Sequence, residues 1–450
     1  MASSVDNKVC QNHYHGRRTM PKPIVCLSAA VCEFAELFRP CFSKRQWKYF
    51  VSVLLGLIEC EGRRTLRGLL AVVGEKVSLC GLSGFFNRWQ WSAAEGAHTW
   101  LERFRDQMQP QVQAEHQRQR AEREKRRGRP PATVVTGDLI VDDSISLKVK
   151  GRKMQGLGRH YSNTEGRVVT GHCLLSGVYG VLGRRCPLQP RLDRQKVVCE
   201  QEGVPFLSKI DLAVQAIEQF EPVAGSHTHL LIDRWFHCRK VRRAAHQRGW
   251  DVSGGLKSNR VMRQIHEDGS RTWLKLSEYA ASLKAADWQE ATWPSQEGER
   301  PVSVHTILTW IRKLGPTRLL ITCHDPENPA QSIRSWGSTL LEADAQTLIP
   351  TLAVRWSIEV LFEDDKDLLG ADHYQVMSAE AVLRFWTLIA CLGYFLDEHK
   401  ALRSHCAPWG DVRRALQKEH QHNLLTWLQG QFQAGLSVVQ VGTQLAIFSS

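Results

Sequence analysis

Two apolar segments that run directly into aspartates constrain the fold of this chain more than any other feature. The segment from Leu139 to Val141 precedes Asp142 and Asp143, and the segment from Leu230 to Ile232 precedes Asp233. Both have the composition of buried strands. A carboxylate beside a buried sheet must be paired or bound to a metal ion, although each aspartate alone could instead cap a turn. The segments therefore predict two strands that end in functional or capping acids.

The order of periodic segments divides the chain. Helical spacing dominates the first hundred residues, and β-type patterns begin after Pro130 and Pro131. Strand, helix and strand then follow one another between residues 229 and 256, which favours a mixed α/β sheet. The predicted parts are a disordered tail (1–22), an N-terminal all-α domain (23–112), a basic linker (113–131), a sheet domain in two pieces (132–257 and 351–400), a β-rich insertion between them (258–350) and a C-terminal helical region (401–450).

The N-terminal helical part carries one candidate for DNA binding. Residues 65–73 and 82–91 form two short helical segments with arginines around them, which is compatible with a helix-turn-helix. A helical bundle that packs or dimerises explains the same spacing, and both interpretations stay open.

The charge of the chain indicates a polyanionic partner. Its formal net charge is +13 and its pI is near 9.2, so nucleic acid is the leading partner class. The basic run of residues 113–129 ends in Arg127-Gly128-Arg129-Pro130, which resembles the core of an AT-hook that binds the minor groove. A solvated charged linker is the alternative.

Cysteine usage and hydropathy exclude two other classes. The thirteen cysteines include no C-x-x-C pair, so we expect buried free thiols in a reducing cytosol rather than zinc knuckles or disulfides. The longest strongly apolar run, Phe385 to Leu396, is shorter than the roughly 20 residues of a membrane span. We expect a soluble, cytoplasmic protein that does not enter membranes.

A third acid lies in a predicted helix near residues 352–369. Arg355, Glu359 and Lys366 are four and seven residues apart and share one face of such a helix. Transfer of a phosphodiester can use two hard cations, which carboxylates hold well. One carboxylate between two cationic side chains suits a metal ion and a phosphate backbone, whereas solvated i,i+4 ion pairs are the bland interpretation.

Together these segments resemble the landmarks of DDE insertion-sequence transposases of the Tyr-Arg-Glu-Lys subgroup over roughly residues 130–400. The landmarks are Asp143-Ser144, Ile232 to Phe236, Gly255 to Arg260, and Arg355-x3-Glu359-x6-Lys366. The resemblance implies an RNase H-like mixed sheet flanked by helices, with Asp143, Asp233 and Glu359 as ligands of two Mg²⁺ ions, or Mn²⁺ in their place. Asp142 is the alternative to Asp143, since neighbouring residues of a strand face opposite sides, and Glu363 is a weaker alternative to Glu359.

The resemblance also implies residues that contact DNA. It assigns Arg355 and Lys366 to phosphates of the transposon end. Lys257, Asn259 and Arg260 follow a strand and offer donors for phosphates, with surface solvation as the alternative. Further aromatic residues are expected mainly in packing roles, with DNA contact as the less favoured interpretation: Trp235, Trp356, His160, Tyr161 and His172.

The implied activity is cut-and-paste transposition of double-stranded DNA by a bacterial, nucleoid-associated homodimer. Water would attack the phosphodiester at each transposon end, and the freed 3′-hydroxyl would then attack target DNA. The signature tyrosine is replaced by Leu352, which favours the alternative of a catalytically decayed DNA-binding regulator. A stand-alone metal-dependent nuclease is a third hypothesis.

Overall fold

The computed structural model describes residues 21–74, 77–124, 134–151, 153–295, 298–324, 332–403 and 408–445. Nearly all of the predicted N-terminal tail lies outside these ranges. The AT-hook-like residues Arg127 and Arg129 lie outside them as well, so their predicted contact with DNA stays a prediction.

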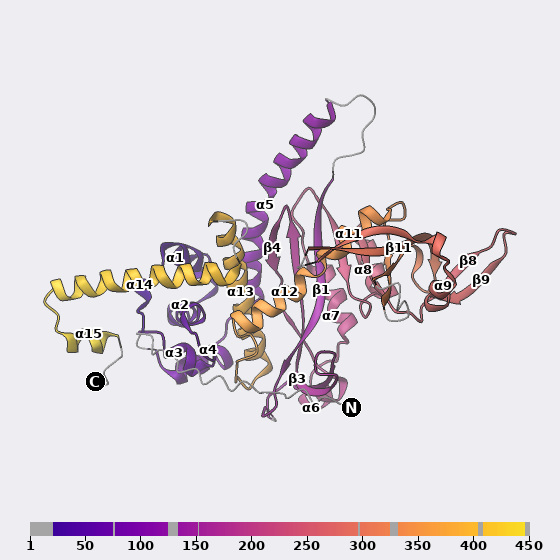
Figure 1. The fold of residues 1–450 in the computed structure, drawn as a ribbon. Helices are drawn as coiled ribbons and strands as arrows, with labels where there is room; N and C mark the ends of the chain where they lie inside the picture. Colours follow the sequence, from indigo (N-terminus) through magenta and orange to yellow (C-terminus); the bar gives the residue numbers. More distant parts are fainter. Residues whose placement is uncertain are drawn as a thin grey trace, which may run out of the picture.

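One mixed sheet organises the molecule (Figure 1). Strand β1 (Val135–Leu147) pairs antiparallel with β3 (Arg167–Val181) and parallel with β6 (Ser226–Ile232), which pairs parallel with β7 (Asp251–Leu256). Three short strands flank β3, namely β2 (Gly158–Ser162), β4 (Arg184–Pro187) and β5 (Arg191–Asp193). The order β2-β3-β1-β6-β7 confirms the predicted RNase H-like arrangement.

The β-rich insertion continues this sheet. Its strands are β8 (Val261–Ile265), β9 (Arg271–Lys275), β10 (Gln289–Ser295), β11 (Gly298–Ile311), β12 (Gly315–Cys323) and β13 (Ile333–Ser338). Since β13 pairs antiparallel with β7, the insertion extends the sheet edge. Helix α9 (Leu276–Ser282) and helix α11 (Ala345–Val354) bury two small apolar clusters against it, both separate from the main core.

Helices cover both sides of the sheet. Helix α7 (Lys209–Gln219) packs against β3 and β5 and beside α8 (Arg239–Gln247), while α6 (Lys196–Glu202) precedes it. Helix α12 (Ser357–Glu363) packs against β1, and the π-helical turn η4 (Asp364–Leu368) follows it and contacts α13 (Ala379–Arg403). The two helical layers therefore approach β1 from opposite faces, because α7 lies near Asp143 and α12 near Asp142.

The N-terminal and C-terminal helices share the main apolar core with the sheet. They are α1 (Ala29–Glu36), α2 (Lys44–Glu59), α3 (Leu66–Leu70), α4 (Leu79–Asn87), α5 (Ala93–Glu124) and α14 (Trp409–Gln433), with short 3-10 turns at Ile24–Cys26 and Arg39–Cys41. Helix α15 (Val438–Gln444) follows α14, and a third 3-10 turn, Ala285–Asp287, lies in the insertion. Buried Arg413 of α14 donates to the carbonyls of Ile58 and Cys60 at the end of α2. Figure 1 shows this helical part on one side of the sheet and the insertion on the other.

Helix α4 is the second helix of the predicted helix-turn-helix. Most of its residues are buried, and Phe86 packs against Phe385 of α13. Arg384 of α13 donates to the carbonyls of Phe86 and Trp91. These contacts support a packing role for α4.

Helix α13 is long and apolar enough to cross a membrane by length and composition alone. However, 89% of its apolar window is buried within the protein, so its apolar surface is already covered. The run from Phe385 to Leu396, predicted to be too short for a membrane span, lies within this helix.

Gly254 permits the close pairing of β6 with β7. A Cβ atom there would lie 2.1 Å from the carbonyl oxygen of Ile232, the residue before Asp233. We therefore expect Gly254→Ala to lower the free energy of unfolding by about 1–3 kcal/mol, as overpacking does, measured by urea denaturation. The control is Gly180→Ala in β3, where the nearest neighbour is 3.8 Å away; equal stability of the two variants would contradict the argument.

Candidate functional site

The pairing of β1 with β6 places two carboxylates side by side. In the parallel register Val141 lies opposite Ile232, so Asp142 lies next to Asp233 where β6 ends. Directly opposed residues of parallel strands point to the same face of a sheet. The local sequence explains why each aspartate lies at this edge, since the apolar residues before it bury each strand in the core.

A local turn fixes Asp233. Its Oδ1 accepts hydrogen bonds from the backbone N–H groups of Trp235 (2.7 Å) and Phe236 (3.0 Å). An aspartate that bonds backbone groups two and three residues ahead forms an Asx-type turn. The turn thus orients the carboxylate, which lines the cleft of the site.

Helix α12 brings the third acid to the same face. The predicted helical segment near residues 352–369 contains a break, because α11 ends at Val354 and α12 begins at Ser357. Bonds from each residue to the third one before it, such as Glu359 N–H to the Trp356 carbonyl (3.0 Å), tighten the chain between them. Ile358 and Phe362 are buried against the core, which turns Glu359 toward β1.

Arg355 links the acids of the site. Its Nη1 lies 3.2 Å from Asp142 Oδ2 and 3.3 Å from Glu359 Oε1. One guanidinium therefore connects carboxylates from β1 and α12, and partial burial strengthens the attraction relative to water.

The electrostatics of Asp142 indicate a site that attracts a further cation. Burial raises the pKa of Asp142 to about 7, repulsion by Asp233 adds to the shift, and the backbone N–H of Asp143 and the charge of Arg355 oppose it. Crowded acids of this kind are typical of divalent-cation sites, since a metal ion offsets the mutual repulsion. The oxygen donors of Asp142, Asp233 and Glu359 fit Mg²⁺ or Mn²⁺.

The structure places Asp143 on the opposite face of β1. Its Oδ2 lies 2.7 Å from Lys209 Nζ of α7 and accepts a hydrogen bond from Cys173 Sγ at 3.0 Å. Of the two alternatives, the geometry favours Asp142 as the partner of Asp233 and Glu359. The sequence signal for this choice was strand alternation, but it could not be applied without the register.

A large cleft of about 2150 Å³ contains all three acids. One wall comes from the sheet and α12, and the other from the insertion, where α9 and β13 line it. Basic side chains from both walls surround the acids: Arg159, Lys209, Arg234, Lys257, Arg334, Arg355 and Lys366. Seven acidic side chains line the cleft as well, so its attraction for a phosphate backbone depends on bound cations together with these basic groups.

The predicted DNA contacts divide into two groups. Lys366 and Lys257 line the cleft; Lys366 donates to the Ile145 carbonyl (3.2 Å), and the Lys257 ammonium lies 4.4 Å from the centre of the exposed Trp235 ring. Arg260 lies outside the cleft lining and donates to the His237 carbonyl (2.6 Å). Asn259 is exposed and also lies outside it.

Several other predicted residues have structural surroundings. Leu352, at the position of the signature tyrosine, is buried where α11 packs against the insertion. Glu363 lines the cleft, while Trp356 is exposed. His172 bonds the Tyr374 hydroxyl and the Gln155 carbonyl, as expected for a packing histidine.

The comparisons with known proteins cover both halves of the site. A family model described as DDE superfamily endonuclease matches residues 37–297, more than half of the chain. A second model, described as transposase DDE domain, matches residues 208–395. The first span includes Asp142 and Asp233, and the second includes Asp233 and Glu359. No curated protein matches the chain.

The two neighbouring aspartates of β1 offer a matched test of metal binding. We expect Asp142→Asn to abolish or strongly weaken Mn²⁺ binding in calorimetric titration, because it removes a ligand from the crowded acids. Asp143→Asn should retain Mn²⁺ binding, since Asp143 faces Lys209. The opposite pattern would return the assignment to Asp143.

Proposed function

Because the chain belongs to the DDE superfamily of endonucleases, we propose that it is a DNA transposase that cuts DNA at transposon ends and joins the 3′-hydroxyl ends to target DNA. Asp142, Asp233 and Glu359 are the proposed ligands of two Mg²⁺ ions. The observation that carries the proposal is their convergence from β1, the end of β6 and α12 within a cleft that basic side chains also line.

The chain's own residues would prepare the site for phosphodiester chemistry. Bound Mg²⁺ or Mn²⁺ would supply activation of the attacking hydroxyl and neutralise charge on the phosphate. Arg355 holds the Asp142 and Glu359 carboxylates on one face, and the turn after β6 orients Asp233. This preorganisation reduces the rearrangement required when DNA enters.

The cleft walls are the proposed path of the DNA backbone. Lys257 follows β7, Arg234 follows Asp233 at the end of β6, and Arg334 approaches from β13 of the insertion. Basic groups on both walls would contact phosphates on two sides of the scissile bond. Concerted cleavage at the two transposon ends would require two copies of the chain on the DNA. Binding to DNA would also place the protein at the nucleoid.

Cleavage tests the catalytic assignment. With a DNA fragment carrying the element's ends, the wild-type protein should cleave and join strands in Mg²⁺ and lose both reactions with chelator. Asp233→Ala and Glu359→Gln should reduce cleavage to background while largely retaining DNA binding, because the basic walls are unchanged. The readout is end cleavage and joining to a plasmid, resolved by gel electrophoresis.

The same assay separates the alternatives. Specific binding by the wild-type protein without cleavage under any divalent cation would indicate a DNA-binding regulator. Cleavage without joining would indicate a nuclease. Cleavage retained in Asp233→Ala would contradict the proposed metal ligands.

Salt dependence tests the DNA path. We expect Lys257→Met to weaken binding similarly for different DNA sequences and to reduce the slope of log affinity against log salt by about 1, as for loss of one phosphate contact. The control is Lys418→Met on α14, an exposed lysine outside the cleft lining. Equal salt slopes for the two variants would place the DNA elsewhere.

A further inference from the structure

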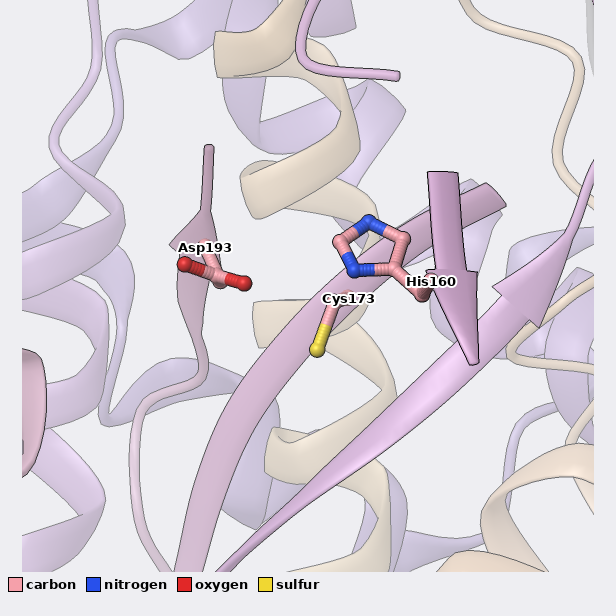
Figure 2. A group of neighbouring side chains, drawn as sticks. All are labelled: His160, Cys173 and Asp193. Carbon is pink, nitrogen blue, oxygen red and sulfur yellow. The ribbon is translucent and has the colours of Figure 1, made fainter. Parts of the chain in front are cut away.

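A second cluster of potential metal ligands lies beside another part of the large cleft, on the side of β1 that carries Asp143 rather than Asp142. His160 of β2, Cys173 of β3 and Asp193 of β5 each present one ligand atom, and these atoms lie within 4.8 Å of one another. All three side chains are buried. Figure 2 shows the imidazole, the sulfur and the carboxylate converging on one small volume between the strands.

Strand pairing brings the three residues together. Cys173 and Asp193 are directly opposed in the antiparallel pair β3–β5, so their side chains point to the same face. His160 reaches them from β2 across Gly158. A Cβ atom at Gly158 would lie 2.6 Å from His160 Nε2, so glycine provides the space in which the ring lies.

The histidine is incompletely satisfied. His160 Nε2 is buried and has no hydrogen-bond partner among the residues that the structure describes. Leaving a buried polar atom unpaired costs about 1–3 kcal/mol. A binding role for the ring offers a reason to keep this costly residue in place.

We propose that His160, Cys173 and Asp193 bind a divalent cation of the zinc class. Nitrogen, sulfur and oxygen donors together suit Zn²⁺ or Co²⁺, whereas Mg²⁺ prefers oxygen ligands only. Binding forms a bond from the cation to the Cys173 sulfur, and the thiol proton passes to the solvent. No change of oxidation state is involved.

The metal-free cluster already contains a competing cation. Lys209 Nζ forms the ion pair with Asp143 Oδ2, and this oxygen also accepts the Cys173 thiol. Withdrawal of the Lys209 ammonium would make Asp143 a fourth ligand, so that the lysine and the metal ion are alternative counter-charges for the same carboxylates. All four of His160, Asp143, Asp193 and Lys209 line the large cleft, which gives a cation a route of entry.

This site is separate from the proposed Mg²⁺ site. It lies on the Lys209 side of β1, whereas Asp142, Asp233 and Glu359 lie on the Arg355 side. It does not depend on DNA cleavage. A cation there would tie β2, β3 and β5 together beside β1, the strand that pairs with β3 and carries Asp142.

Cobalt provides a probe that distinguishes the two sites, because the three-acid site contains no sulfur. Titration of the full-length protein with Co²⁺ should produce a thiolate-to-cobalt charge-transfer absorption. Cys173→Ser and Asp193→Asn should lose or greatly weaken this band. Lys209→Met should tighten Co²⁺ binding by about tenfold or more, because it removes a cation that competes for the same carboxylates.

Cys186→Ser is the matched control, since Cys186 is also buried but lies on β4 and bonds only the Pro187 carbonyl among the hydrogen bonds described. Its band should match that of the wild-type protein, and circular dichroism checks the fold of each variant. A thiolate band absent from both the wild-type protein and Lys209→Met would overturn the proposal. A band that survives in a folded Cys173→Ser protein would overturn it equally.

Discussion

The close approach of two carboxylates at the ends of parallel strands is the constraint on which the site depends. The register of β1 with β6 forces Asp142 and Asp233 onto one face of the sheet, where burial and repulsion both oppose ionisation. Such an arrangement persists only if nearby groups offset the charge. The surrounding structure is organised to supply that compensation, from Arg355 and from the turn that follows β6.

The Asp142-Asp143 pair shows how one strand serves two environments. Each aspartate has a cation of its own: Arg355 on the α12 side and Lys209 on the α7 side. Each helical layer therefore places a cationic side chain against one of two adjacent aspartates of β1. Both cations come from elements far away in sequence. Removing either cationic side chain would leave a partly buried carboxylate without its counter-charge.

The insertion supplies one wall of the cleft and is continuous with the main sheet. Its strand β13 pairs with β7, so the sheet that carries the acids continues into the opposite wall of the cleft. The backbone ladder fixes the distance between the walls more firmly than a flexible linker would. Leu352 belongs to this wall, because it packs in the small apolar cluster between α11 and the insertion strands.

Much of this organisation could be predicted from local patterns. Apolar runs ending in acids, the order of strands and helices, and the spacing of Arg355 and Glu359 indicated the mixed sheet and the family, since these features depend on neighbouring residues alone. The choice between Asp142 and Asp143 required tertiary structure, because side chains alternate along a strand and only the partner register decides which face is which. Tertiary structure also determined the break between α11 and α12 and the proximity of His160, Cys173 and Asp193. Both result from packing between segments that are distant in sequence.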